Sequence, residues 1–158
     1  MSTPYFLQEA LVNEIEALFA GFETENASGK LAPLNVYPQS LPEKQDEDDS
    51  AYFPYVVVRI MDGGLDNEDG AANCRIVFVT GIYDSNPNYQ GNKTILNILQ
   101  KIQTHLFSKR IVAGKFKIEY PYNWQIYDEE DLHPYYFGGA ETNWTLPAVQ
   151  QEVWKNGF

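Results

Sequence analysis

The sequence predicts an α+β domain in which helices pack on one face of a mostly antiparallel sheet, with long acidic loops between the elements. Two segments place apolar residues three and four positions apart, which is typical of amphipathic helices. Other segments are short runs of β-branched and aromatic residues bounded by turn formers, which is typical of strands. The order along the chain is helix, long loop, two strands, helix and further strands. The length of 158 residues predicts a single domain, 1–158.

The first element is a helix with Thr3 as its N-cap and Pro4 in its first turn. Its apolar stripe is formed by Phe6, Leu7, Leu11, Ile15, Leu18 and Phe22. Acidic residues interrupt the segment at Glu9, Glu14 and Glu16, and no basic leader precedes it. The segment is therefore predicted to be neither a signal peptide nor a membrane span.

A long polar loop is predicted from 24 to 50, with one short strand around 34–38. Five carboxylates fall within 43–50. Because these charges repel one another and stay solvated, we expect this part of the loop to be mobile.

Two antiparallel strands are predicted at 55–61 and 74–83, where β-branched and aromatic residues dominate. The connection between them, 62–73, is rich in Gly and in acids, and we expect it to be a second mobile loop. Its candidate mobile residues are Asp62, Asp66, Glu68 and Asp69. A calcium-binding EF-hand does not fit, because Gly64 or Gly70 stands where an acid is required.

A second helix begins after Gly91-Asn92-Lys93-Thr94 and carries an apolar face made by Ile95, Ile98, Leu99, Ile102 and Leu106. The tetrapeptide looks like part of a phosphate-binding loop, in which Lys directly follows the second Gly. Here Asn92 separates Gly91 from Lys93, and Asn86 stands where the first Gly is required. We expect no nucleotide cofactor, and Gly91 is predicted to free the backbone at the helix entry.

The remaining strands are predicted after this helix. Residues 114–122 and 123–128 form one interrupted strand or two, and 134–147 form a last strand with a glycine bulge at Gly138-Gly139. Residues 150–158 are predicted to be a free tail.

The formal net charge of −11 predicts a surface that repels nucleic acid, unless basic residues gather on one face. For the same reason, an acidic surface also suits a protein past which DNA must move without binding. The single Cys74 lies in an apolar run, where we expect a buried free thiol of a reducing compartment.

No group of residues in the sequence matches a known catalytic motif well, and we predict that the protein is not an enzyme. Residues 128–131 and His133 form an acidic cluster, but alternate side chains of an extended chain point to opposite sides, so few could converge on one metal ion. A metal-dependent hydrolase using Asp128 to Asp131 stays the least favoured alternative. His105 has no nucleophile motif beside it, and we expect it to be a partly buried structural residue.

Aromatic residues are dense after position 119, and alternation along strands cannot bury all of them on one side of a small sheet. Because exposed Tyr and Trp are enriched at interfaces, the surplus predicts a partner surface. The candidate interface residues are Trp124, Tyr127, Tyr135, Tyr136, Trp144 and Trp154. A small carbohydrate- or protein-binding module that uses these aromatics is the alternative.

The order of these elements is similar to that of a known family. A helix LQEALVNEIEALF, a proline-bearing loop, a strand FPYVVVRI, an acidic connection, a strand RIVFVTGIYD and the segment YQGNKTILNILQKIQTHL follow one another. From Leu7 to about Trp144, this arrangement resembles the tail terminator (tail completion) proteins of long-tailed bacteriophages and prophages.

The resemblance implies a structural subunit without cofactors that forms a ring, typically a hexamer, on the last ring of the tail tube. Such a ring ends tube growth and presents a surface for joining the head. The implied partners are further copies of the chain, the tail tube protein and a head–tail connector or neck protein, with DNA passing through the ring. The implied location is the virion tail, after assembly in the host cytoplasm. A connector or neck protein of the same assembly is the neighbouring alternative.

Overall fold

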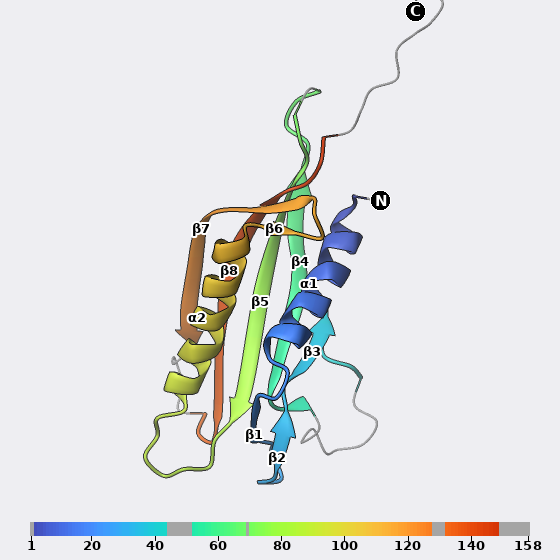
Figure 1. The fold of residues 1–158 in the computed structure, drawn as a ribbon. Helices are drawn as coiled ribbons and strands as arrows, with labels where there is room; N and C mark the ends of the chain where they lie inside the picture. The colour runs from blue at the N-terminus through green and yellow to red at the C-terminus, as the bar shows by residue number, and fades with distance from the viewer. Residues whose placement is uncertain (1, 44–51, 69, 128–131, 149–158) are drawn as a thin grey trace, which may run out of the picture.

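The computed structural model describes residues 2–43, 52–68, 70–127 and 132–148. Two helices lie over one face of a six-stranded sheet (Figure 1), which confirms the predicted α+β class. The elements are α1 (Pro4–Leu18), β1 (Glu23–Glu25), β2 (Leu31–Pro33), β3 (Asn35–Pro38), β4 (Tyr55–Gly64), β5 (Asn73–Tyr83), α2 (Asn92–Lys109), β6 (Ile111–Val112), β7 (Phe116–Tyr127) and β8 (Tyr135–Thr145).

The large sheet has the strand order β3-β4-β5-β8-β7-β6. All of its pairs are antiparallel except that of β3 with β4. The antiparallel pairing of β4 with β5 confirms the predicted pair of strands. Strands β1 and β2 form a separate two-stranded sheet that the sequence analysis did not anticipate.

Helix α1 begins as predicted, with Thr3 Oγ1 accepting a hydrogen bond from Phe6 N–H (3.4 Å) and Pro4 in the first turn. The apolar stripe is buried at Leu7, Leu11 and Ile15. The helix ends at Leu18, so Phe22 packs on the core from outside the helix.

Helix α2 buries the five residues predicted for its apolar face. The predicted role of Gly91 is wrong, because its φ of −62° is an ordinary helical angle that any residue adopts. Gly91 is needed for a steric reason instead, because a Cβ atom at this position would collide with the ring of Tyr136. The glycine lets the start of α2 lie directly against β8.

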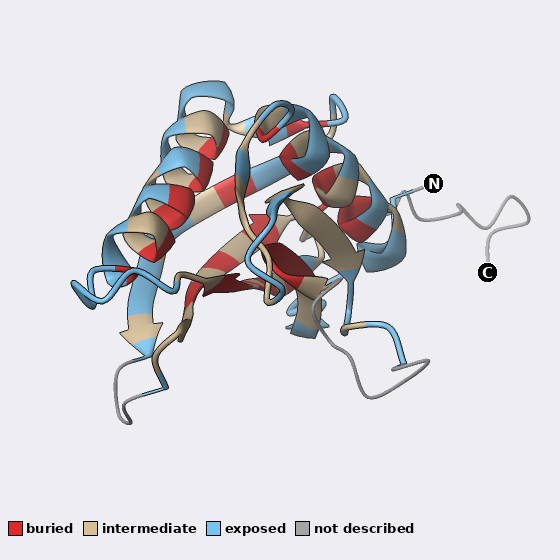
Figure 2. Cartoon of the chain, turned by 90° about the horizontal axis from the view of Figure 1, so that it is seen from below, coloured by how far each residue is buried: buried red, intermediate tan, exposed pale blue. Residues whose placement is uncertain are grey.

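The main core lies between the helices and the sheet (Figure 2). Every second residue of β5 from Cys74 to Ile82 is buried there, which confirms the predicted burial of Cys74. Figure 2 shows the buried positions of both helices on the sides that face the sheet. A smaller cluster centred on Phe53, Tyr55 and Val57 covers one end of the opposite sheet face.

The predicted bulge at Gly138-Gly139 is wrong, because the pairing of β8 with β5 is continuous through both glycines. The irregularity lies instead in β7, where the register against β8 shifts between Glu119 and Asn123. Gly138 is needed for close packing, since a Cβ atom there would lie 2.5 Å from Cγ2 of Ile95.

The acidic connection is shorter than predicted, because β4 continues to Gly64 and leaves residues 65–72 between the strands. Asp62 therefore belongs to a strand, where the Nη2 atom of Arg75 lies 2.7 Å from its Oδ2 atom. Among the other predicted mobile residues, Asp66 and Glu68 lie in the connection, and Asp69 is outside the described residues. Most of 43–50 and all of 150–158 are also outside them.

One side chain completes the edge of β4 where β3 ends. The amide of Gln39 donates to the carbonyl of Ile60 (3.1 Å) and accepts from the N–H of Ile60 (3.0 Å). The same amide oxygen accepts a hydrogen bond from the buried amide of Gln8 on α1 (3.0 Å). Gln39 thus makes the contacts of a strand residue and ties α1 to the sheet.

Candidate interaction surface

The structure separates the predicted interface residues into three groups. Trp144 is buried in the core at 1% exposure, so its prediction as an interface residue is wrong. Its indole Nε1–H donates to Thr142 Oγ1 (2.8 Å), and the Thr142 hydroxyl donates to the carbonyl of Ile76 (2.8 Å). Trp154 lies outside the described residues. The other four residues lie on or beside the outer part of β7 and the start of β8.

Trp124 and Tyr127 are the exposed members of this set, at 44% and 41%. They are three residues apart on β7 and therefore point to opposite faces of the strand. Tyr127 is paired with Phe137 and belongs to the face that the helices leave uncovered. Among the described residues, β6 pairs only with the first two residues of β7, and no strand pairs with the outer edge of 123–127. Aromatic side chains thus flank both faces of an unpaired strand edge.

A groove of about 470 Å³ lies where the end of β7, the start of β8 and the approach to α2 meet. We call it the aromatic groove. Its lining includes Tyr89, Tyr127, His133, Tyr135, Tyr136 and Phe137. Three of the six predicted interface residues, Tyr127, Tyr135 and Tyr136, therefore line one concave surface.

Tyr89 and His133 form one wall of the aromatic groove. Their ring centroids are 4.1 Å apart, and Nδ1 of His133 lies 3.0 Å from the hydroxyl of Tyr136. Tyr89 is 54% exposed and has a positive φ of 57°. The sequence analysis missed Tyr89, because one aromatic residue inside a polar turn carries no periodic signal.

A second hollow of about 290 Å³ lies on the uncovered sheet face. Arg75 lies in its lining between two carboxylates, 2.7 Å from Asp62 and 2.9 Å from Glu141. The hydrogen bonds that Arg75 donates to Asp62 and then to Glu141 raise the pKa of its guanidinium, and the bonds from Arg75 lower the pKa of Asp62. Tyr127 lines this hollow as well as the aromatic groove.

The predicted structural histidine lies between the helices. His105 Nε2 is 2.9 Å from Glu14 Oε2, and Lys109 binds the other oxygen of the same carboxylate. Hydrogen bonding from Lys109 and then from His105 lowers the pKa of Glu14 against the opposing effect of burial. Burial also raises the pKa of the Cys74 thiol, which makes it a poor nucleophile.

No group of three His, Cys, Asp or Glu side chains suited to a metal ion occurs within 2–43, 52–68, 70–127 and 132–148. The acidic cluster 128–131 lies outside these ranges, so the hydrolase alternative stays a prediction. Neither described helix has the length and apolar character needed to cross a membrane. No protein-family model matches the chain, and a search of curated proteins finds no match.

Proposed function

We propose that the chain is a structural subunit that joins copies of itself into a ring on the end of a phage tail tube, ending tube growth and presenting a surface to the head. The observation that carries this proposal is the exposed aromatic surface around the unpaired edge of β7, at Trp124 and Tyr127. Large aromatic side chains beside concave surfaces are typical of the central contacts in protein interfaces.

Ring formation requires two different surfaces on each subunit, because a head-to-tail contact joins unlike patches. The sheet offers two unlike edges. One is the aromatic edge of β7, and the other is β3, a strand of four residues that ends at Pro38. The net charge of −11 also supports a channel that DNA can pass without binding tightly.

Light scattering coupled to size-exclusion chromatography, followed by negative-stain electron microscopy, tests the proposal. We expect concentration-dependent oligomers that include rings, and capping of purified tail tubes. The double variant Trp124→Ala/Tyr127→Ala is expected to lose most of the association while staying folded. The matched control is Tyr5→Ala/Leu31→Ala, which removes two side chains with 58% and 74% exposure from α1 and β2.

A protein that stays monomeric at high concentration and does not bind tail tubes contradicts the proposal. Binding to a connector complex but not to tube ends favours the neck protein of the same assembly. If the aromatic variant and its control lose association equally, the aromatic surface is not the site of the contact.

A second candidate function is carbohydrate binding in the aromatic groove. The adjacent rings of Tyr89 and His133, tilted by 34°, lie with Gln90 and Asn92 in the lining and offer the aromatic faces and amide groups that sugar rings use. Binding on a glycan array that is lost in Tyr89→Ala favours this function. An array without any bound glycan opposes it.

A further inference from the structure

Basic residues gather at one corner of this acidic chain. Four of its 11 Lys and Arg residues fall within 109–117, around the end of α2 and the turn between β6 and β7. Lys109 is already bound to Glu14. The same region exposes two large apolar side chains, Ile111 and Tyr120. We call the set Arg110, Ile111, Lys115, Lys117 and Tyr120 the basic corner.

Contacts and strand pairing connect four members of the basic corner, and Lys115 lies in the turn between β6 and β7. The Arg110 guanidinium lies 4.9 Å from the ring centroid of Tyr120, which is 70% exposed. Ile111 is 44% exposed and is paired across the strands with Lys117. The carboxylate of Glu119 lies 3.9 Å from both Arg110 Nη2 and Lys117 Nζ. The segment 109–120 carries four basic residues and one acidic residue, so its net charge is positive. Arg and Tyr stacked beside an exposed Ile are typical of protein interfaces rather than of phosphate sites.

A surface of opposite character lies on the hairpin of β4 and β5. Figure 1 shows this hairpin projecting beyond the end of the sheet. Met61 and Leu65 are 47% and 57% exposed, and Asp66 and Glu68 are exposed beside them. Asn73 donates to the carboxylate of Asp66 (3.1 Å) and fixes the base of the connection. We call the set Met61, Leu65, Asp66 and Glu68 the acidic arm.

We infer that the acidic arm of one copy of the chain docks on the basic corner of the next copy. Both surfaces pair exposed aliphatic side chains with charges, and the charges are opposite in sign, so a contact buries apolar area and pairs the ions. The two surfaces are different, so the contact is head-to-tail and propagates from copy to copy. This inference rests on the proposed function, because it names a contact that holds the ring together.

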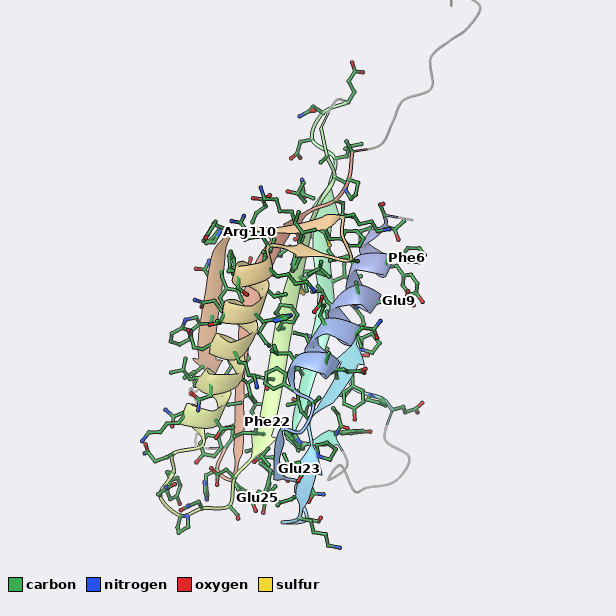
Figure 3. All side chains as sticks on the ribbon, viewed as in Figure 1. Phe6, Glu9, Phe22, Glu23, Glu25 and Arg110 are labelled. Carbon is green, nitrogen blue, oxygen red and sulfur yellow. The ribbon has the colours of Figure 1, made fainter. Side chains whose placement is uncertain are left out.

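The positions of the two surfaces suit such a contact. Figure 3 places Arg110 at the end of the molecule from which the arm projects, away from Glu23 and Glu25. The arm points away from the body of its own chain, which leaves its tip accessible to a neighbour. Successive arms then form a belt along one rim of the ring.

Charge reversal on each side and a mixture of the two variants test the inference. The corner variant is Lys115→Glu/Lys117→Glu, and the arm variant is Asp66→Lys/Glu68→Lys. Arg110 is left unchanged because its guanidinium donates to the carbonyl of Ile118 (2.9 Å). By analytical ultracentrifugation, each variant alone is expected to need about tenfold or more protein for half-association, since like charges then meet. An equimolar mixture restores wild-type association, because each reversed surface finds a complementary partner.

Matched controls change the net charge equally at distant, exposed positions. Lys30→Glu/Lys93→Glu matches the corner variant, and Glu16→Lys/Glu23→Lys matches the arm variant. Both controls are expected to associate like the wild type. Wild-type association is also expected to weaken as salt rises, because partly exposed charges are screened.

Three results overturn the inference. If the wild type associates and either reversal leaves its association unchanged, the arm contact is wrong while the proposed ring stands. If the mixture does not recover, the two surfaces do not meet each other. If the corner variant associates normally but loses binding to a fluorescent DNA duplex, the basic corner binds nucleic acid and not the acidic arm. A strictly monomeric wild type that also fails to cap tail tubes overturns the proposed function itself.

Discussion

Replacing Thr142 with Val tests whether the buried hydroxyl holds the indole of Trp144 in the core. Thr142 and Trp144 have exposures of 0% and 1%, so no bulk water replaces a lost partner. The substitution keeps the side-chain shape but removes the acceptor of the indole N–H and the donor to the carbonyl of Ile76. The variant Thr142→Val is therefore expected to fold and to be less stable.

The magnitude follows from these two hydrogen bonds. An orphaned buried donor costs about 1–3 kcal/mol, and a lost neutral hydrogen bond costs about 1 kcal/mol. The added methyl group offsets roughly 0.8 kcal/mol. The expected loss is therefore about 1–3 kcal/mol, which lowers the melting temperature by about 2–4 °C per kcal/mol in a domain of this size.

Thr80→Val is the matched control. Thr80 is also 0% exposed and donates to the carbonyl of Tyr55 (2.9 Å), but no side chain among the described residues donates a hydrogen bond to its oxygen. This control should lose at most about 1 kcal/mol. Urea unfolding at constant m-value measures both variants.

A double-mutant cycle isolates the indole contact. With Trp144→Phe in the background there is no N–H to orphan, so Thr142→Val should then cost no more than Thr80→Val does. If Thr142→Val is within about 0.5 kcal/mol of Thr80→Val in the wild-type background, the assignment of the hydroxyl as a required acceptor is wrong.

Three further predictions concern the helices and their contact with the sheet. Gly138→Ala should lower the free energy of unfolding by about 1–3 kcal/mol, because its Cβ atom would meet Ile95 at 2.5 Å. Unchanged urea unfolding would mean that α2 moves away from β8 at no cost. Glu14→Gln should lower the free energy of unfolding above the usual carboxyl pKa of 4.5, where the wild-type carboxylate is charged and its lowered pKa stabilises the fold. The wild type loses this stability as the pH falls through the lowered folded-state pKa, so the free energies of unfolding of the two proteins should converge in acid. A difference that stays constant with pH would contradict this. Lys93→Ala should leave both stability and assembly intact, whereas Ile98→Asp should unfold the domain, because it places a charge in the core. Circular dichroism measures the folding of both variants. Loss of assembly in a folded Lys93→Ala protein would show that this lysine has a functional role.

The helices and the central strands could be predicted because their burial follows a strict period. The five residues of α2 chosen for their spacing are the ones that pack on the sheet. The parallel pairing of β3 could not be predicted, because four residues carry no sign of strand direction and the partner is distant in the sequence. The β1–β2 pair is shorter still.

The candidate surface was predicted in part, and the error at Trp144 shows why. Aromatic density indicates that some rings lie outside the core, but it does not say which ones. Trp144 is buried because its register places it opposite Cys74, on the helix-covered face, whereas Tyr127 falls on the uncovered face. The Gly-Gly pair was misassigned for a similar reason, since close packing and a bulge both require small residues.

The position of β8 has a consequence for how the chain is made. The last strand of the described residues, β8, is inserted between β5 and β7, and residue 145 is paired with both residue 73 and residue 117. Until the end of β8 leaves the ribosome, β5 and β7 each keep an open edge, and the two parts of the sheet are not joined. Truncations inside β8 should therefore give insoluble chains, because the two parts of the sheet then stay unjoined.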